Sequence, residues 1–348
     1  MSNYLQKRKF KDIDLSDVFF DTLKADYQGF ENWFIKKQNE EAYILINNQF
    51  LEGFLYLKYE DGPIADVMPS IQCEKALKIG TLKINPHGTR LGERFIKKAI
   101  DYAILGKVEL CYVTVFEKHE ALVNLFYRYG FTKHGVKKNE SGNEMVLVKR
   151  FTEIKGDILL DYPLINTYKK QKFVLSIYPN YHSVMFPDSI LKNEKVDILE
   201  DVTYTNSIHK TYVTRMAVNR ANPGDIFIMY RTRTPGKSAE YSSVVSSVCV
   251  VEEVRSQSEF NNFDEFYKYA TTYSIFDKED LRLWYNKGGC FAVKMTYNAA
   301  LSKRLIRQKL IEEIGLEREG YWGFFELTDD QFNRILREGG VSEGIVIN

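Results

Sequence analysis

The stretch LKINPHGTRLGERFIKKAI, residues 82–100, decides the fold of the first half of the chain. It begins as a strand, passes through a turn that contains Gly88 and Gly92, and ends in a basic amphipathic helix. A glycine-containing turn at a helix N-terminus lets backbone N–H groups point at a phosphate, and the helix dipole favours the negative charge. The segment is therefore either a phosphate-binding turn or an ordinary strand–turn–helix connection.

The segments on both sides of this stretch predict a mixed sheet with helices packed on it. Strands are expected over residues 7–13, 41–48, 50–60, 75–85, 108–117, 131–138 and 144–151. Helical spacing of apolar residues predicts one long or two short helices over 15–38, and further helices over 92–104 and 119–130. The turn NESGN, residues 139–143, joins the last two strands in a hairpin.

In this order of elements, residues 5–150 resemble the GCN5-related N-acetyltransferase (GNAT) family. In that family a loop of the form (Arg or Gln)-x-x-Gly-x-(Gly or Ala) holds the pyrophosphate of acetyl-CoA. The matching residues are His87, Gly88, Thr89, Arg90, Leu91 and Gly92. The first position is thus His, and Arg90 replaces the middle glycine. Arg90 can add its own charge to the contact with the pyrophosphate or the 3'-phosphate.

The resemblance implies an α/β fold with a splayed sheet and acetyl-CoA as the cofactor. The strand that ends at Ile84 and the strand of residues 112–117 would part at their C-terminal ends, with the pantetheine threaded between them. Backbone groups of the first strand, including those at Ile84, would pair with the pantetheine amides. A backbone N–H there would polarise the acetyl carbonyl.

Candidate acids and bases follow the second of these strands. Glu117 or His119 can deprotonate an acceptor directly or through water, or can simply begin the next helix. The family's tyrosine acid lies five residues before the Phe of a Gly-Phe pair, and counting back from Phe131 places Phe126 there. Tyr127 is one residue later, about 100° further round the helix. The usual acid is therefore expected to be missing, with Tyr127 as a possible substitute.

The second half is expected to be a separate domain. We place a GNAT-like domain at 1–152, a linker at 153–171, and a small β-barrel with helical cover at 172–348. KFVLSIYPNYHSVMF (172–186) and NPGDIFIMYRTRT (222–234) resemble the PUA-like superfamily, in particular its ASCH and EVE-type members. Members of that superfamily commonly bind RNA or modified bases. Pro223, Gly224 and Asp225 also suit a turn by their own chemistry.

Basic and aromatic residues alternate in two predicted strands of this half. Such an alternation suits RNA backbone contact and base stacking, or else plain strand faces with inward aromatics. The candidates for RNA contact are His209, Lys210, Tyr212, Arg215, Tyr230, Arg231 and Arg233.

The leading hypothesis is an acetyl-CoA-dependent N-acetyltransferase for an amine of RNA or an RNA-linked substrate, such as a tRNA or aminoacyl-tRNA. One alternative is a protein or small-molecule amine acetyltransferase with a structural second domain. Another is an acyl-CoA-binding sensor without catalysis, motivated by the missing tyrosine and the altered loop.

Composition bears on which partners, metal sites and cellular location are expected. Lys and Arg total 48 against 47 acids, which argues against a non-specific polyanion binder but not against a local basic groove. Four cysteines without CxxC pairing predict buried reduced thiols rather than a zinc or other metal site. No apolar run approaches membrane-spanning length and the first residues lack an apolar signal region, so a cytoplasmic protein without membrane contact is expected.

Overall fold

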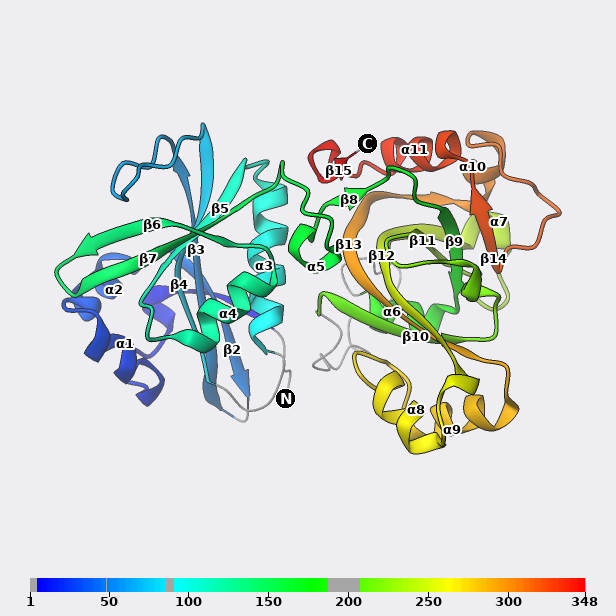
Figure 1. Ribbon diagram of the computed structural model, residues 1–348, viewed down its shortest axis with the longest axis horizontal. Coiled ribbons are helices and arrows are strands. Elements are labelled where there is room, and N and C mark those ends of the chain that lie inside the picture. Colours follow the sequence, from blue (N-terminus) through cyan, green and yellow to red (C-terminus); the bar gives the residue numbers. More distant parts are fainter. Residues whose placement is uncertain (1–4, 48, 86–90, 187–206, 348) are drawn as a thin grey trace. The chain divides into compact units, whose positions relative to one another are not determined.

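The structure is a computed structural model that describes residues 5–47, 49–85, 91–186 and 207–347. These residues divide into two compact units, one up to Lys155 and one from Gly156 onward. Each unit has its own sheet and its own helices (Figure 1).

The first unit is built on a mixed sheet. Among the described residues its strand order is β1-β2-β3-β4-β5-β7-β6. The strands are β1 (Gln6–Lys9), β2 (Glu41–Asn47), β3 (Phe50–Asp61), β4 (Lys75–Ile84), β5 (Leu110–Val115), β6 (Thr132–Asn139) and β7 (Gly142–Arg150). Only β4 and β5 pair in parallel; the other neighbours are antiparallel. This is the mixed sheet that the sequence predicts.

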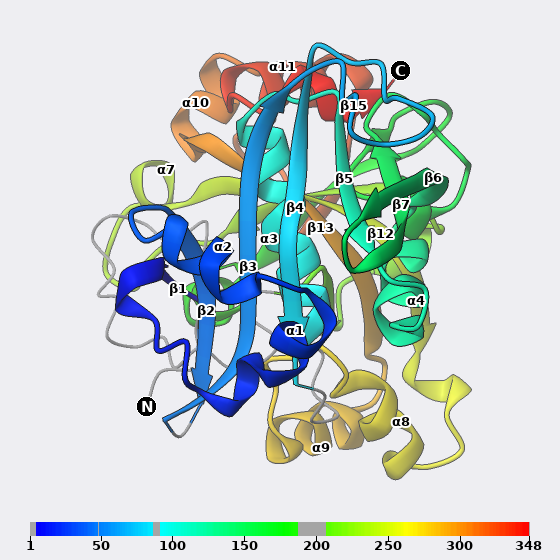
Figure 2. The same ribbon diagram turned by 90° about the vertical axis from the view of Figure 1, so that its left-hand side faces the viewer.

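Helices cover both faces of this sheet. They are α1 (Asp21–Asp26), α2 (Phe30–Lys36), α3 (Leu91–Leu105) and α4 (Glu120–Arg128), with short 3-10 turns η1 (Phe10–Asp12) and η2 (Val18–Phe20). Figure 2 shows α1 and α2 in front of β3 and β4, and α3 behind them. In front, Phe10, Phe20, Phe34 and Phe54 form a buried aromatic cluster. Behind, the ring of Phe95 in α3 lies against Gly53 of β3, where a side chain would collide with it.

The N-terminal strand is shorter than expected. Residues 10–13 do not continue β1, because Phe10 turns inward as the first residue of η1 and is fully buried. Its N–H donates to Glu40 O at 2.9 Å, so the turn still closes against the segment before β2. Burial of a large aromatic ring outweighs the strand-like alternation of the sequence here.

The C-terminal end of α4 explains the sequence YGF. Gly130 has φ +81°, the left-handed conformation that a residue with a Cβ seldom adopts. The N–H of Gly130 donates to Tyr127 O at 3.0 Å, and that of Phe131 donates to Phe126 O at 3.2 Å. This is a Schellman motif, and the rings of Phe126 and Phe131 pack against each other with centroids 4.9 Å apart. The motif therefore commits Phe126 to the core, where it is fully buried.

The second unit is built on another mixed sheet. Among the described residues its strand order is β10-β13-β12-β11-β9-β14, and β8 and β15 form a separate pair. The strands are β8 (Ile165–Asn166), β9 (Lys172–Ile177), β10 (His209–Thr214), β11 (Ile226–Arg231), β12 (Val244–Ser256), β13 (Phe291–Ile306), β14 (Phe324–Leu327) and β15 (Val346–Ile347). β9 and β11 are parallel. β12 and β13 are long and carry several register shifts, which bend the sheet towards a barrel.

Helices and turns complete this unit. They are α5 (Ile158–Asp161), α6 (Pro179–Met185), α7 (Ala239–Ser242), α8 (Phe263–Ala270), α9 (Lys278–Lys287), α10 (Arg307–Glu312), α11 (Asp329–Glu338), η5 (Val218–Arg220), η6 (Gln257–Glu259) and η7 (Glu343–Ile345). The expected turn before β11 is present: Asp225 accepts from the N–H groups of Asn222 at 2.8 Å and Gln171 at 3.0 Å, beside Gly224 at φ +89°. The polar composition of residues 192–205 also predicts a linker, and these residues lie outside the part of the chain that the structure describes.

Two segments of this unit differ from expectation. Residues 156–171 do not form a free linker: Tyr162 is fully buried and donates to Tyr297 O at 3.0 Å, and β8 pairs with β15. The apolar spacing of SKRLIRQKLIEEIG, residues 302–315, predicts a helix. Residues 302–306 instead extend β13, because Leu305 and Ile306 pair with Val245 and Val244 of β12. Long-range pairing overrides local helical periodicity there.

Candidate active site

The sheet of the first unit opens between β4 and β5. Their parallel register runs from Ala76 opposite Leu110 to Ile79 opposite Val113, although β4 continues to Ile84 and β5 to Val115. Beyond Ile79, the described pairing of β4 is with β3 alone. One edge of β4 therefore presents backbone N–H and C=O groups towards the opening, as the expected splay requires (Figure 2).

A β-bulge marks the point where the strands part. Tyr56 of β3 is opposite Thr81 and Leu57 is opposite Ile79, so Gly80 is the extra residue of β4. A Cβ at Gly80 would come within 2.7 Å of the Tyr56 ring, so this close approach favours glycine. The bulge turns the second half of β4 away from β5, and the glycine makes the bulge possible.

The predicted cofactor loop lies mostly outside the described residues. His87, Gly88, Thr89 and Arg90 belong to that undescribed part, and the description resumes at Leu91, the first residue of α3. Leu91 is buried. A Cβ at Gly92 would come within 2.6 Å of Leu125 Cδ2 in α4 and 3.5 Å of Ile84 Cδ1 at the end of β4. The close packing of Leu125 alone therefore favours glycine at position 92, independently of any phosphate contact by the backbone.

A carboxylate–imidazole pair lies at the end of β5. His119, the residue that precedes α4, has Nε2 3.0 Å from Asp26 Oδ2 at the end of α1. Lys118 Nζ lies 2.6 Å from the other oxygen of Asp26. The Asp26 side chain is 15% exposed and the His119 side chain 37% exposed, so the pair is shielded while the imidazole still reaches solvent. Glu117, the other predicted base, is exposed.

Tyr127 faces away from the position that Phe126 occupies. Its side chain is 37% exposed, and its hydroxyl lies 3.4 Å from Met145 Sδ in β7. Phe126, one residue earlier, points into the core. The helix has ordinary α geometry up to Arg128, so the rotation of about 100° between neighbouring residues accounts for the difference.

A segment of the N-terminal helices spans the two arms of the opening. On the β4 arm, Lys83 Nζ hydrogen-bonds Phe19 O and Thr22 Oγ1. On the other arm, Tyr27 donates its hydroxyl to Glu144 Oε1 of β7 at 2.9 Å, and its ring packs on Phe116 with centroids 5.0 Å apart. We call residues 19–28 the strap. Burial lowers the pKa of Lys83, and burial together with the charge of Glu144 raises the pKa of Tyr27.

A second group of perturbed side chains lies on the strands just before the opening. Lys78 Nζ is 3.8 Å from Glu60 Oε1 and 4.0 Å from Asp66 Oδ2, and Tyr112 donates to Glu60. Burial lowers the pKa of Lys78. Burial also raises the pKa of the Glu60 carboxyl, but the Tyr112 hydrogen bond and the lysine charges outweigh it and hold that pKa below its usual range. Because Tyr112 is fully buried, this group belongs to the core under the β3–β4 loop.

The sequence did not reveal the strap or the residue that holds His119. Asp26, Tyr27 and Lys83 have no distinctive pattern of their own, and Asp26 is 93 positions from His119. Only the fold brings them together. A carboxylate between two short helices was the sole local signal, and such residues usually end a helix or begin a turn.

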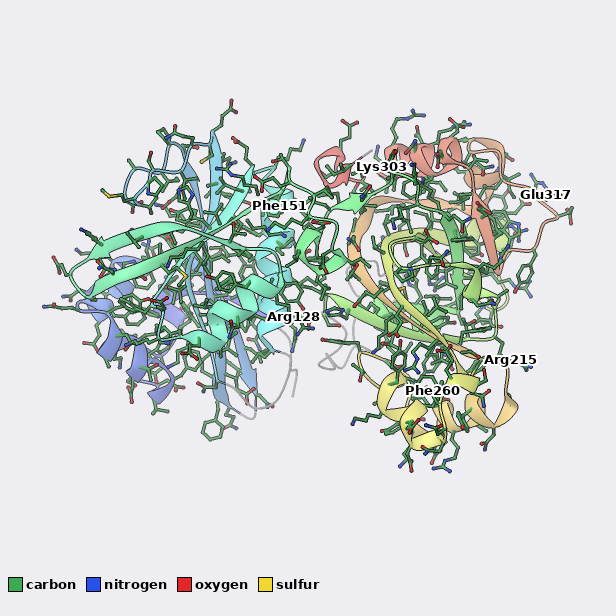
Figure 3. The ribbon with its side chains drawn as sticks, viewed as in Figure 1. Arg128, Phe151, Arg215, Phe260, Lys303 and Glu317 are labelled. Carbon is green, nitrogen blue, oxygen red and sulfur yellow. The ribbon has the colours of Figure 1, made fainter. Side chains whose placement is uncertain are left out.

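The predicted RNA-contacting residues of the second unit do not share an exposed face. Five of the seven are buried: His209, Lys210, Tyr212, Tyr230 and Arg231. The expectation that these five contact RNA at the surface is therefore corrected, because the strands that carry them are covered on both faces. Arg215 and Arg233 are exposed (Arg215 is labelled in Figure 3).

The buried members have partners inside the unit. His209 Nδ1 lies 2.6 Å from Glu252 Oε1. Lys210 Nζ lies 5.7 Å from the centre of the Tyr297 ring, and Arg231 donates to Thr234 Oγ1 at 3.3 Å. These contacts indicate structural roles for His209, Lys210 and Arg231.

In the part of the chain that the structure describes, no group of three or more His, Cys, Asp or Glu side chains is arranged to hold a metal ion. No helix among residues 5–47, 49–85, 91–186 and 207–347 is both long and apolar enough to cross a membrane. All four cysteines are free, and Cys111, Cys249 and Cys290 are buried, as expected.

Comparisons with known proteins give matches at the level of structure. No protein-family model matches the sequence, and no curated protein matches it. Solved structures that resemble the chain include ASCH from Zymomonas mobilis, with 10% identity over 48% of this chain and 94% of that chain and a TM-score of 0.34. A GNAT-family acetyltransferase from Streptococcus pneumoniae matches with 15% identity over 42% and 99%, and a TM-score of 0.30.

A third match is the NatC complex bound to Gag peptide and CoA, with 15% identity over 43% of this chain and 99% of that chain and a TM-score of 0.30. Both of the families that the sequence resembles are thus represented among the similar structures. The description of the fold itself rests on the strand order, the bulge and the register given above.

Proposed function

We propose that the first unit is an acetyl-CoA-dependent N-acetyltransferase that acts on an amine. The observation that carries this proposal is the opening of the sheet at Gly80, where the freed edge of β4 faces the diverging end of β5. An extended chain of amides such as pantetheine can pair with such an edge as a further strand would. α3 starts shortly after β4, so its N-terminal N–H groups face the same end, which suits a pyrophosphate.

The chemistry needs few side chains. The acceptor amine must lose a proton as it attacks the acetyl carbonyl, and a backbone N–H near the bulge can stabilise the oxyanion. His119, at the end of the β5 arm, is the best-placed candidate for the base. The CoA thiolate then leaves and takes a proton from water, so that Tyr127 has no required role.

Acceptor-dependent release of CoA thiol from acetyl-CoA tests this function. The whole chain would be incubated with a peptide pool, with polyamines and with tRNA, and the acetylated product identified by mass. We expect turnover with at least one amine, and a loss of about 10²–10⁴-fold in the variant His119→Gln. His134→Gln, which changes the histidine that contacts Pro69 O, is the matched control and should keep full activity. CoA binding without turnover of any acceptor would favour the sensor alternative instead.

The finer proposal is that the second unit recruits RNA or an RNA-linked amine, such as a tRNA or aminoacyl-tRNA. It is supported by the resemblance of that unit to the PUA-like superfamily and by the exposed cations Arg215 and Arg233. Partners would then be acetyl-CoA and RNA, in the cytoplasm that the sequence predicts. Acetyl label on a peptide or polyamine, with none on RNA, would favour the alternative of a structural second unit.

Filter binding at moderate salt tests the RNA part separately. We expect the double variant Arg215→Ala with Arg233→Ala to bind tRNA more weakly and with a smaller salt slope, because two phosphate contacts are lost. Arg337→Ala removes another exposed arginine, in α11, and should leave binding unchanged. Absence of affinity for any RNA pool would contradict the finer proposal and leave the acetyltransferase proposal standing.

A further inference from the structure

The imidazole of His119 is oriented from one side only. Its Nε2 lies 3.0 Å from Asp26 Oδ2, and the other ring nitrogen has no partner among the described residues. A neutral imidazole that donates its Nε2–H to a carboxylate carries its lone pair on Nδ1. The contact with Asp26 therefore selects the tautomer in which the free nitrogen can accept a proton.

Other charged and titratable groups around this pair come from the turn before α4, from the strap, and from strands β4 and β7. Lys83 of β4 interacts electrostatically with Asp26. Lys118, in the same turn as His119, contacts the second oxygen of Asp26 at 2.6 Å. Glu117 and Glu120 flank the turn and are exposed. Tyr27 and Glu144 lie beside it and hydrogen-bond each other at 2.9 Å. Asp26 is thus shared between an imidazole and an ammonium group, and the two compete for its charge.

The position of Asp26 is itself fixed by the strap. The next two residues are tied to the β6–β7 hairpin: Tyr27 by its bond to Glu144, and Gln28 by its N–H, which donates to Ser141 Oγ at 2.8 Å. Glu144 is 4% exposed and also accepts from Asn139 Nδ2 at 2.7 Å. Asp26 is therefore held by its neighbours at the side of the imidazole.

We propose that Asp26 is a positioning residue that makes His119 the general base of the acetyl transfer. Lys118 contacts the same carboxylate and so weakens the effect of Asp26 on His119. This inference rests on the proposed function. In the step concerned, the amine nitrogen forms a bond to the acetyl carbon and gives its proton to His119 Nδ1, directly or through one water. The C–S bond breaks, and the CoA thiolate leaves with the electron pair of that bond. The negative charge of Asp26 stabilises the imidazolium that forms.

The test uses two variants that act in opposite directions. In Asp26→Asn the shape and a hydrogen bond are retained, but the imidazolium loses its counter-charge. The acid limb of the kcat/KM profile should then move to lower pH by about 0.5–1 unit. In Lys118→Met the imidazolium loses a repulsive positive charge, and Asp26 no longer pairs with a lysine. The acid limb of the kcat/KM profile should therefore move to higher pH. Asp26→Glu should restore most of the original profile.

Matched controls come from an exposed ion pair of the same unit that lies outside the strap. Glu41→Gln and Lys7→Met change an acid of β2 and a lysine of β1 that contact each other and not His119, so both should leave the profile in place. If Asp26 had only a structural role, Asp26→Asn and Lys118→Met would both lower the melting temperature, and the acid limb of the kcat/KM profile would not shift in opposite directions. Shifts in the same direction, or an unchanged limb in Asp26→Asn, would overturn the inference.

A direct titration separates this inference from the proposed function. NMR of the histidine-labelled chain, with the His119 signal assigned from His119→Gln, follows the midpoint and the tautomer in each variant. We expect the Nε2–H tautomer in the parent, and midpoints that move oppositely in Asp26→Asn and Lys118→Met. Turnover in the parent with no change at His119 would overturn the inference alone. Absence of turnover with every acceptor would overturn both.

Discussion

His119 and Tyr127 lie at opposite ends of α4, and their surroundings differ in chemistry. His119 precedes the helix and contacts a carboxylate, whereas among the described residues the hydroxyl of Tyr127 has a thioether sulfur as its one polar contact. A thioether is a weak acceptor and does not orient or activate a phenol. His119, at the start of the helix, is therefore a better candidate for a catalytic residue than Tyr127 near its end.

The variant Tyr127→Phe tests this assignment at the level of one atom. It removes the hydroxyl near Met145 Sδ and leaves the ring, so we expect kcat to fall by less than about 3-fold, far from the 10²–10⁴-fold effect of a lost general acid or base. The acceptor-dependent thiol release assay measures it. A loss above about 100-fold would show that the hydroxyl reaches the CoA sulfur.

A second residue-scale prediction concerns His182 in α6. It is fully buried with Nε2 2.6 Å from Ser246 Oγ, and burial and the nearby charges of Arg231 and Arg304 lower its pKa to about 3. In the unfolded chain His182 takes up a proton near pH 6.5, whereas in the folded protein it stays neutral to a much lower pH. The free energy of unfolding is therefore unaffected by this group above pH 6.5. It decreases progressively as the pH falls from about 6.5 towards 3, by about 2 kcal/mol at pH 5.

Urea unfolding at pH 7 and pH 5 measures this loss. In a Trp33→Phe background, the remaining tryptophans Trp284 and Trp322 both lie in the second unit and report its unfolding. We expect His182→Gln to flatten the pH dependence, while His134→Gln leaves it as steep as in the parent. An equal slope in His182→Gln would contradict the assignment of the buried neutral imidazole.

At the scale of elements, the packing of α3 on α4 depends on the absence of a side chain at Gly92. Leu125 of α4 occupies the space that a Cβ would need. This contact joins the helix that follows β4 to the helix that follows β5, and so it stabilises the two arms of the opening. Gly92, the last residue of the proposed phosphate-binding loop, thus also has a steric reason to be glycine.

The variant Gly92→Val should destabilise the first unit by about 1–3 kcal/mol through overpacking. Adding Leu125→Ala opens space beside it, so the double variant should lose less than the sum of the two single variants. Urea denaturation of the four proteins gives the coupling. Simple additivity would show that the helices do not touch at this point.

The sequence predicted most elements because their signals are local. β5 is a continuous apolar run, and Gly130 ends α4 where expected. Residues 302–306 were predicted wrongly because their helical periodicity is overridden by pairing with β12. The pair of Asp26 and His119 was not predictable, since it joins residues far apart in the chain. The burial of Lys210 and Arg231 could not be predicted from the sequence either, because basic residues in strands usually face solvent.

At the scale of the whole molecule, the chain consists of two units with separate cores, and the division falls near Lys155. Tyr162, Leu164 and Ile165 are buried in the second unit, and each large buried side chain is worth about 2 kcal/mol. Residues 156–171 therefore belong to the folding of the second unit.

Two fragments of the second unit test this boundary. Residues 156–348 should unfold cooperatively. Residues 172–348 should be less stable by several kcal/mol, because this fragment lacks Tyr162, which donates to Tyr297 O, and β8, which pairs with β15. Thermal unfolding followed by circular dichroism compares them. Equal melting temperatures would show that residues 156–171 act only as a linker.

We propose that the opening between β4 and β5 holds the pantetheine of acetyl-CoA. A crystal structure of the whole chain with bound CoA tests this proposal. We predict pantetheine amides about 2.7–3.2 Å from backbone N–H and C=O groups of residues 80–84, with the thiol on the side of Gly80. CoA bound elsewhere, or β4 and β5 paired along their full lengths with the cofactor present, would contradict the account.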